Sequence, residues 1–371
     1  MKESKRILAV FGTRPEAIKM CPLINELKSR AEFEVRVCLT GQHKEMLCGV
    51  LEHFSVKGDY DLGIMKAGQT LFEITQGTVD SLRPILESLK PDTVLVHGDT
   101  TSAFAAALAC FYLGIPVGHV EAGLRTYNIR SPYPEEFNRR VISVIARYHF
   151  APTNTAKQNL LREGVNEDRV FVTGNTGIDA LKTTVREDYT HEFLEACKGK
   201  RLILITAHRR ENLGEPMKNM FRAIKRVIAE NKDAYAIYPI HMNPAVRNVA
   251  NGILSGEERI KIIPPLDVFD FHNFMAKSHL ILTDSGGIQE EAPALGVPVL
   301  VMRDTTERPE GIDAGTLRLA GISEEGIYKE FTRLLNSPEE YSKMAMAKNP
   351  YGDGEASRRI ADILHASLKD L

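Results

Sequence analysis

The sequence predicts an α/β protein built from two doubly wound parallel sheets. Short apolar segments without alternating polarity are separated by segments with helical periodicity, a pattern typical of parallel strands buried on both faces. The pattern begins near residue 7 and begins again near residue 202. The chain has 371 residues, which is too long for one ordinary core and suits two domains.

Apolar runs in the first half predict strands at residues 7–11, 35–40, 93–97, 117–120, 148–151 and 170–173. Helices are expected from about Pro15, from about Lys44, and over residues 102–113 and 135–147. Pro15 supports the first of these helices, because proline is favoured at the first helical position.

The same alternation returns in the second half of the chain. Strands are expected at residues 202–206, 234–239, 260–263, 279–283 and 298–302. Helices are expected at residues 217–230, 269–277 and 288–295, and the tail 355–371 has the pattern of an amphipathic helix.

The domain boundary is expected between residues 174 and 200, where charged residues become frequent and the strand pattern is lost. We take residues 1–173 as an N-terminal Rossmann-like domain, with the helix 355–371 packing back on it. Residues 174–354 then form a C-terminal Rossmann-like domain. Doubly wound domains bind ligands at the carboxyl ends of their strands, so a deep cleft between the two domains is expected.

Composition excludes several classes of protein. The formal net charge is −2, so no global basic field favours nucleic acid. The five cysteines show no C-x-x-C pair and no metal-like spacing, which suits reduced thiols in a cytoplasmic protein without a metal site. The longest apolar stretch, 103–117, is interrupted by Gly114 and Pro116, so no membrane span is expected.

The most informative segment is the turn Asp284-Ser285-Gly286-Gly287, which stands between an expected strand and an expected helix. Backbone N–H groups at such a turn are unpaired and suit a phosphate. Glu290 and Glu291 follow, and a carboxylate there can accept hydrogen bonds from a ribose diol. Together these features indicate a nucleotide or nucleotide-sugar. The alternative is a flexible turn followed by two solvated glutamates.

Carboxylates follow two expected strands of the first domain and the loop after them. Asp99 follows the strand 93–97, Glu121 follows the strand 117–120, and Glu135 stands in the next loop. Because strand ends of one sheet lie at one edge, these carboxylates should converge. The alternative roles are helix capping for Asp99 and compensation of a helix dipole for Glu135.

Basic residues follow the first strand of each domain. Arg14 and Lys19 could reach a diphosphate from the first domain, although their surroundings lack the G-x-G-x-x-G dinucleotide motif. In the second domain His208 is followed by two arginines, which favours a diphosphate site in which His208 could protonate a departing phosphate. His241 is a weaker candidate of the same kind.

Taken together, these residues resemble the non-hydrolysing UDP-N-acetylglucosamine 2-epimerase family. The resemblance rests on segments in the same order along nearly the whole chain, namely FGTRPEAIKM (11–20), HGDTTS (97–102), GHVEAGLRT (118–126), SPYPEEFNRR (131–140), TGNTGIDAL (173–181), AHRREN (207–212), LTDSGGIQEEAP through RDTTERPE (282–310) and NPYGDGEAS (349–357).

The resemblance implies a glycosyltransferase-B-like fold and reversible inversion at C2 of the sugar. UDP-GlcNAc and UDP-ManNAc would be interconverted by elimination of UDP to 2-acetamidoglucal and re-addition, without NAD or metal. The product would supply ManNAc for cell-surface polysaccharides. Asp99, Glu121 and Glu135 resemble the catalytic carboxylates of the family, with His208 at the diphosphate. The residues that resemble phosphate or substrate ligands are Arg14, Ser285, Gly286, Gly287 and Arg308, with Glu291 for the ribose diol and Phe271 for uracil.

Bacterial members of this family bind a second UDP-GlcNAc as an activator, and a homodimer is the family expectation. The positions that match the activator site are Gln42, Gln69, Arg209 and His241. Glu45 and Gly68 depart from residues that some members have there, which puts activation of this chain in doubt.

Three other functions compete with epimerisation. A hydrolysing relative would release UDP and free ManNAc, but the SPYPEE and AHRREN segments resemble the non-hydrolysing branch. A glycosyltransferase would share the fold and the 285–291 segment but not the three carboxylates together. A non-catalytic nucleotide-sugar sensor would be expected to lack at least one of the catalytic residues.

Overall fold

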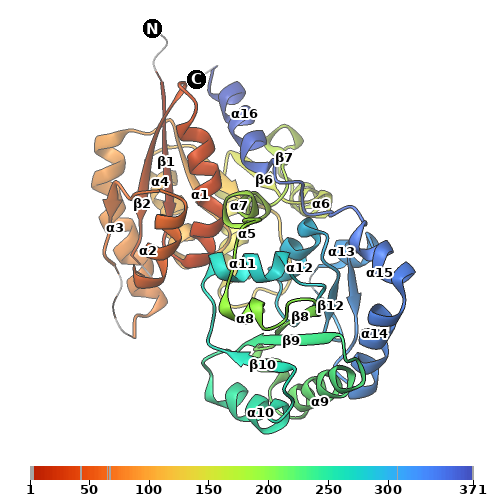
Figure 1. The fold of residues 1–371 in the computed structure, drawn as a ribbon. Coiled ribbons are helices and arrows are strands. Elements are labelled where there is room, and N and C mark those ends of the chain that lie inside the picture. The colour runs from red at the N-terminus through yellow and green to blue at the C-terminus, as the bar shows by residue number, and fades with distance from the viewer. Residues whose placement is uncertain (1–3, 42–43, 65, 67, 307, 370–371) are drawn as a thin grey trace. The chain divides into compact units, whose positions relative to one another are not determined.

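The computed structural model describes residues 4–41, 44–64, 66, 68–306 and 308–369, and it divides into two compact units. Unit 1 comprises Met1–Thr183 and Tyr351–Leu371, and unit 2 comprises Thr184–Pro350 (Figure 1). The division differs from the expected one, because residues 174–183 and 351–354 belong to unit 1 and not to the second domain.

Hydrogen bonds explain this difference. The Asn175 N–H donates to the Tyr351 carbonyl at 2.7 Å, and the Asp179 carboxylate accepts from the N–H groups of Ala356 and Ser357 at 3.2 and 2.6 Å. The chain therefore returns to unit 1 just before its last helix. These contacts join residues that are far apart in sequence, so no local pattern marks them.

Unit 1 is built on a parallel sheet in the order β3-β2-β1-β4-β5-β6-β7. Its strands are β1 (Lys5–Phe11), β2 (Phe33–Leu39), β3 (Tyr60–Asp61), β4 (Thr93–His97), β5 (Val117–Val120), β6 (Tyr148–Ala151) and β7 (Val170–Val172). β1 and β4 are almost completely buried, as their unbroken apolar sequences predict.

The helices of unit 1 are α1 (Arg14–Lys28), α2 (Lys44–His53), α3 (Leu71–Leu89), α4 (Thr101–Tyr112), α5 (Glu135–Ile145), α6 (Asn154–Arg162), the 3₁₀ turn η1 (Glu167–Arg169), α7 (Thr176–Thr184) and α16 (Ala356–Leu368). Thr13 and Glu16 form a capping box that starts α1, and Pro15 stands in its first turn. The last helix, α16, packs against α1, so the C-terminal helix belongs to the unit that the first strand and helix begin (Figure 1).

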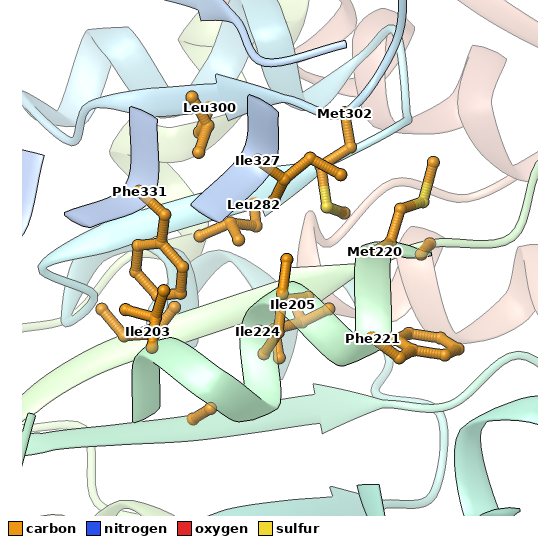
Figure 2. Close-up of a cluster of buried hydrophobic side chains, with 14 of the residues drawn as sticks. Ile203, Ile205, Met220, Phe221, Ile224, Leu282, Leu300, Met302, Ile327 and Phe331 are labelled. Atoms are coloured by element: carbon orange, nitrogen blue, oxygen red, sulfur yellow. The ribbon is translucent and has the colours of Figure 1, made fainter. Parts of the chain in front are cut away.

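Unit 2 repeats the arrangement with a parallel sheet in the order β10-β9-β8-β11-β12-β13. Its strands are β8 (Arg201–Thr206), β9 (Ala234–Pro239), β10 (Ile260–Ile263), β11 (Leu280–Thr283), β12 (Val299–Val301) and β13 (Leu317–Leu319). Figure 2 shows the core on one face of this sheet, where Ile203 and Ile205 of β8 meet Ile224 and Phe331 of the covering helices.

The helical elements of unit 2 are α8 (Glu192–Glu195), the 3₁₀ turn η2 (Arg210–Asn212), α9 (Glu215–Glu230), α10 (Pro244–Leu254), α11 (Val268–Ala276), α12 (Ile288–Glu291), the 3₁₀ turn η3 (Ala292–Leu295), α13 (Pro309–Asp313), α14 (Glu324–Asn336) and α15 (Pro338–Ala345). The helix expected over 288–295 is therefore wrong in its extent. Pro293 has no N–H to donate to the Gln289 carbonyl, so the α-helical turn ends after Glu291 and continues as 3₁₀.

Both sheets have the Rossmann strand order, in which the first strand of the unit lies beside its fourth. In unit 1 these strands are β1 and β4, and in unit 2 they are β8 and β11. The connections from the two neighbouring strands leave in opposite directions, so the strand ends between them stay open to a ligand. The fold therefore singles out the turns after Phe11, His97, Thr206 and Thr283.

We predict that Gly123→Ala destabilises unit 1. Gly123 has φ +91°, and a Cβ atom there would fall on the carbonyl group of Ala156 in α6. The free energy of local unfolding, measured by hydrogen exchange of the β5 and β6 amides, should fall by about 2–4 kcal/mol. Gly49→Ala in α2, where a Cβ meets nothing within 4 Å, is the control and should change stability by less than about 1 kcal/mol. Equal effects of the two changes would contradict this account.

Candidate functional site

The turns after β1 and β4 in unit 1 are joined by one buried carboxylate, Glu16. Its Oε2 accepts hydrogen bonds from the N–H groups of Gly12 and Thr13 at 3.0 and 2.7 Å. Its Oε1 accepts from the Thr100 hydroxyl at 2.7 Å, and Thr100 caps α4. Glu16 therefore fixes the two turns at the switch point relative to each other. The Thr13 capping-box spacing was the sequence signal for this role.

Glu121, the carboxylate after β5, is held from several sides. Its backbone has φ +63°, which is uncommon for a residue with a side chain. Its Oε2 forms an ion pair with Lys19 and accepts from Asn175 Nδ2 at 3.1 Å, and His97 Nε2 lies 3.8 Å away. The side chain is 13% exposed. The structure thus places Lys19 beside a candidate catalytic carboxylate, whereas the sequence suggested a diphosphate contact.

Asp99, after β4, belongs to the same electrostatic cluster. Burial raises its pKa, and the nearby charges of Glu121 and Glu135 raise it further, while the Arg139 guanidinium lowers it. Arg139 donates a short hydrogen bond to Asp99 Oδ2. The structure therefore brings together the three carboxylates that the sequence singled out. A carboxyl group with a raised pKa is suited to exchanging a proton.

The sequence pattern did not single out a fourth carboxylate, Glu136, which is important in the structure. It is completely buried and accepts hydrogen bonds from the N–H groups of Thr126 and Tyr127, both at 3.0 Å. Its Oε2 also lies 3.4 Å from the Arg139 guanidinium. Glu136 therefore fixes the loop after Glu121 to the start of α5, which carries Glu135. Nothing in the local pattern distinguishes it from its neighbour Glu135.

Three buried histidines lie on adjacent strands beneath this cluster. Burial lowers the pKa of His97 to about 4, of His119 to about 3 and of His149 to about 4, so all three are neutral near pH 7. His119 Nε2 lies 2.7 Å from the Gly98 carbonyl and supports the turn that carries Asp99. These side chains add no positive charge to the carboxylate cluster.

In unit 2 the turn after β8 is held by Asp284, at the end of β11. The Asp284 carboxylate is completely buried and accepts from the N–H groups of His208 and Arg209 at 3.0 and 2.9 Å. It also accepts from Asn212 Nδ2 at 3.0 Å. The hydroxyls of Thr206 and Thr283 lie 2.6 Å apart and join the two strands just before this turn.

His208 follows β8 directly and so lies at this switch point, while its role at a diphosphate stays a prediction. Its ring stacks on His241 with 5.3 Å between the centroids and 10° between the planes. Its Nδ1 lies 3.8 Å from Asp284 Oδ1. Burial lowers the pKa of His208, with smaller lowering effects from His241 and Arg209, while Asp284 opposes them. The imidazole is therefore neutral near pH 7 in this structure.

The Ser285-Gly286-Gly287 turn lies beside His208, because β11 neighbours β8. Within the described part of the chain, the N–H groups of Gly286 and Gly287 donate to no acceptor, whereas the Ser285 N–H donates to Thr283 Oγ1 at 2.9 Å. These two backbone donors are candidates to bind an anion, and of the two residues Gly287 is exposed and Gly286 is buried. The expected contribution of a helix dipole is small, because α12 has a single turn.

Glu290 and Arg308 form a close ion pair, and Glu290 is buried. Arg308 was expected to bind substrate, and in the structure it neutralises this carboxylate. Glu291 is instead partly exposed, and its Oε2 lies 3.7 Å from His272 Nε2. His272 Nδ1 lies 2.7 Å from the Thr184 hydroxyl. Phe271 precedes His272 in α11 and is partly buried, so the expected ribose and uracil residues lie on neighbouring elements.

The remaining predicted residues are spread over the two units. Arg14 is exposed and makes no ion pair with any described residue. Gln69 donates to the Ile64 carbonyl in unit 1, whereas Arg209 lies 3.5 Å from Glu211 in unit 2. Gln42, the fourth expected activator residue, lies outside the described residues.

The described residues contain neither a metal-binding cluster nor a membrane-spanning helix. No group of three or more His, Cys, Asp or Glu side chains in this part of the chain is arranged to hold a metal ion. None of the helices described is long and apolar enough to cross a bilayer.

Comparison with known proteins gives closely similar relatives. The profile of the family described as UDP-N-acetylglucosamine 2-epimerase matches residues 25–365. The UDP-N-acetylglucosamine 2-epimerase of Bacillus subtilis (strain 168) is 58% identical over 364 residues, which cover 98% of this chain and 96% of that protein.

Solved structures agree with these sequence matches. A crystal structure of a Listeria monocytogenes protein has a TM-score of 0.95 at 54% identity, covering 100% of this chain and 98% of that one. The UDP-GlcNAc 2-epimerase of Neisseria meningitidis bound to UDP-GlcNAc has a TM-score of 0.87 at 50% identity, covering 97% and 100%. The glycotransferase of kitacinnamycin shares the fold alone, with a TM-score of 0.66 at 13% identity. The glycosyltransferase-B-like fold is therefore confirmed.

We predict that Arg139→Gln raises the pKa of Asp99 further. The substitution removes the cation that opposes burial and the charges of Glu121 and Glu135. A carbon-13 NMR titration of the aspartate carboxyl groups should show Asp99 losing its proton at a higher pH than in the unchanged protein. Arg140→Gln is the matched control, because Arg140 lies 3.6 Å from Glu163 and is 41% exposed. An unchanged or lower Asp99 pKa in Arg139→Gln would show that this guanidinium does not govern the cluster.

Proposed function

The chain belongs to the UDP-N-acetylglucosamine 2-epimerase family, and we propose that it interconverts UDP-GlcNAc and UDP-ManNAc by elimination and re-addition of UDP. The observation that carries the proposal is the cluster of Asp99, Glu121 and Glu135 around the open strand ends of one sheet. The second sheet has candidate backbone donors in the Ser285-Gly286-Gly287 turn and an imidazole at its own switch point. This reaction needs two kinds of group, namely acid–base groups for the sugar and hydrogen-bond donors for the diphosphate.

The first step breaks the bond between C1 of the sugar and the β-phosphate oxygen. The electron pair of that bond leaves with UDP, and positive charge develops on the sugar ring. The acidic cluster of unit 1 stabilises this charge, and donors of unit 2 stabilise the departing diphosphate.

Loss of the C2 proton to a carboxylate then forms the double bond of 2-acetamidoglucal. The reverse sequence adds a proton to the other face of C2 and UDP to C1. We assign the two proton transfers to Asp99 and Glu121, with Glu135 as the third carboxylate of the cluster. The raised pKa of Asp99 supports this assignment, because it suits a group that holds a proton during turnover.

We assign UDP to unit 2. Ser285, Gly286 and Gly287 bind the diphosphate together with His208. Glu291 accepts the ribose diol, and Phe271 contacts uracil. Arg14 and Arg308 are assigned to substrate as well, whereas Lys19 is assigned to holding Glu121 ionised, because the two form an ion pair.

The test is proton NMR of the purified protein with UDP-GlcNAc in D2O, without added metal or NAD. Appearance of UDP-ManNAc with deuterium at C2 is the expected result. Free ManNAc with UDP would mean a hydrolysing enzyme. No reaction at all, even at high substrate, would favour a transferase or a sensor and overturn the proposal.

We predict that Glu121→Gln retains UDP binding and loses epimerisation by at least about 100-fold, because the amide cannot take a proton from C2. Calorimetry with UDP and the NMR assay measure the two effects separately. Glu167→Gln is the control, because Glu167 pairs with Lys157 at 2.8 Å in the same unit and is 73% exposed. Full activity of Glu121→Gln would remove this carboxylate from the mechanism.

We also propose that the protein is a homodimer that associates through α4 and α5. Phe104 and Phe111 are seven residues apart on α4, and Phe137 and Val144 are seven apart on α5, so each pair shares a helix face. The rings of Phe104 and Phe137 are 6.0 Å apart, which places the two faces side by side. Phe111, Phe137 and Val144 are 61%, 46% and 85% exposed. Such an apolar face is typical of an interface.

We predict that Val144→Asp converts the dimer to a monomer, because a charge at this face opposes apolar packing. Light scattering coupled to size-exclusion chromatography measures the mass. Met346→Asp is the control, since Met346 is 80% exposed but belongs to unit 2. A dimer that survives Val144→Asp would show that the subunits meet elsewhere.

The binding of a second UDP-GlcNAc as an activator and the cytoplasmic location of the protein stay predictions.

A further inference from the structure

We infer that Asp284 is a positioning residue for His208, holding the imidazole so that Nε2 meets the diphosphate as a protonated donor. The inference rests on the proposed function only in taking UDP as the ligand of this turn. Asp284 acts through the contacts that it makes within unit 2.

Several hydrogen bonds fix the Asp284 carboxylate to the turn that carries His208. The carboxylate is completely buried, and a buried charge is stable only when its oxygens are paired. Oδ2 accepts from the backbone N–H groups of His208 and Arg209 and from Asn212 Nδ2, and Oδ1 also accepts from the backbone N–H of His208 at 3.2 Å. Asp284 therefore fixes the backbone from which the imidazole projects.

The same carboxylate also lies beside one of the two ring nitrogens of His208. Nδ1 of His208 lies 3.8 Å from Asp284 Oδ1, so this edge of the ring faces the carboxylate. His241 covers a face of the ring in a stacked arrangement. Nε2 is the nitrogen left for a ligand. A carboxylate behind Nδ1 favours the tautomer with the proton on Nδ1 and stabilises the imidazolium when Nε2 gains a proton.

The charges facing His208 come from several elements. Asp284 on the β11 end raises the pKa of His208, and Arg209 of its own turn and His241 after β9 lower it. Tyr238 of β9 donates its hydroxyl to the Ala207 carbonyl at 2.6 Å, and burial raises its pKa, so it stays uncharged. Burial makes the largest contribution and keeps the free imidazole neutral near pH 7.

A diphosphate placed at Nε2 changes this balance. Two anions, Asp284 and the phosphate, would then flank the ring, and His208 would take one proton from solvent. On cleavage of the C1–oxygen bond, the electron pair stays on the phosphate oxygen and the Nε2 proton can pass to it. His208 then returns to its neutral form.

Proton uptake on binding of UDP tests this inference. Calorimetry at pH 8 in two buffers of different ionisation enthalpy should show uptake approaching one proton per site. Asp284→Asn lacks the negative charge that stabilises the imidazolium, so uptake should fall towards zero. Affinity for UDP should drop about tenfold or more at pH 8 and by less at pH 6. A purely structural loss would weaken binding equally at both pH values.

Asp179→Asn is the matched control, because Asp179 also accepts two backbone N–H groups but lies in unit 1. It should leave proton uptake unchanged. Unaltered uptake in Asp284→Asn would overturn the inference while leaving the proposed function intact. Absence of UDP binding to the unchanged protein would instead count against the proposed function.

The unchanged protein provides a second measurement if Asp284→Asn does not fold. Nitrogen-15 NMR of the histidine rings at pH 9 distinguishes the two neutral tautomers. We expect the proton of His208 on Nδ1. A proton on Nε2 would overturn the inference, because Asp284 would then not orient the ring.

Discussion

Buried carboxylates that accept backbone N–H groups hold the turns on which the candidate site depends. Glu16 binds the amides after β1, Glu136 binds those of the loop after β5, and Asp284 binds those after β8. Each carboxylate is at least 97% buried. An ionised acceptor makes stronger hydrogen bonds than a neutral one, and at these depths the loss of a partner is costly. The turns after these strands are thereby held in place by hydrogen bonds.

These buried carboxylates affect the charge of the candidate site differently in the two units. In unit 1 the supporting carboxylate Glu136 shares Arg139 with Asp99, and Asp99 lies near Glu121 and Glu135, so negative charge accumulates where a sugar cation would need it. Arg139 lies close to both Glu136 and Asp99 and limits that accumulation. In unit 2 the supporting carboxylate lies behind a histidine, and the same negative charge would repel a diphosphate unless the imidazole between them carried a proton.

Sequence patterns found the parts of the structure that depend on local chemistry. Strands such as β4, β5 and β9 were predicted to the residue, because unbroken apolar runs are sufficient for buried parallel strands. β3 has only two residues and leaves no pattern. α3 has a capping box at Thr70, but Gly77 and Pro84 interrupt its sequence, and no helix was expected there. The two units divide at 183/184, inside the expected window 174–200, but residues 174–183 and 351–354 had been placed in the second domain. Their place depends on Asn175 and Asp179 bonding to residues near 351–357, far along the chain.

In the candidate site, too, the sequence predicted the residues that depend on local patterns and not those that depend on distant contacts. Asp99, Glu121 and His208 were predicted because polar residues directly after parallel strands meet at one edge. The residues that position these side chains were not predicted. Only burial distinguishes Glu136 from Glu135, or Asp284 from an ordinary turn aspartate. From sequence alone, a carboxylate in a turn is interpreted as a helix cap or a ligand-binding group, because its spatial neighbours are not known. The order of the strands supplies the missing information: a residue that ends the fourth strand necessarily faces the turn that ends the first. For Asp284 that turn carries His208, so the strand order that opens the site also brings the carboxylate up to the imidazole.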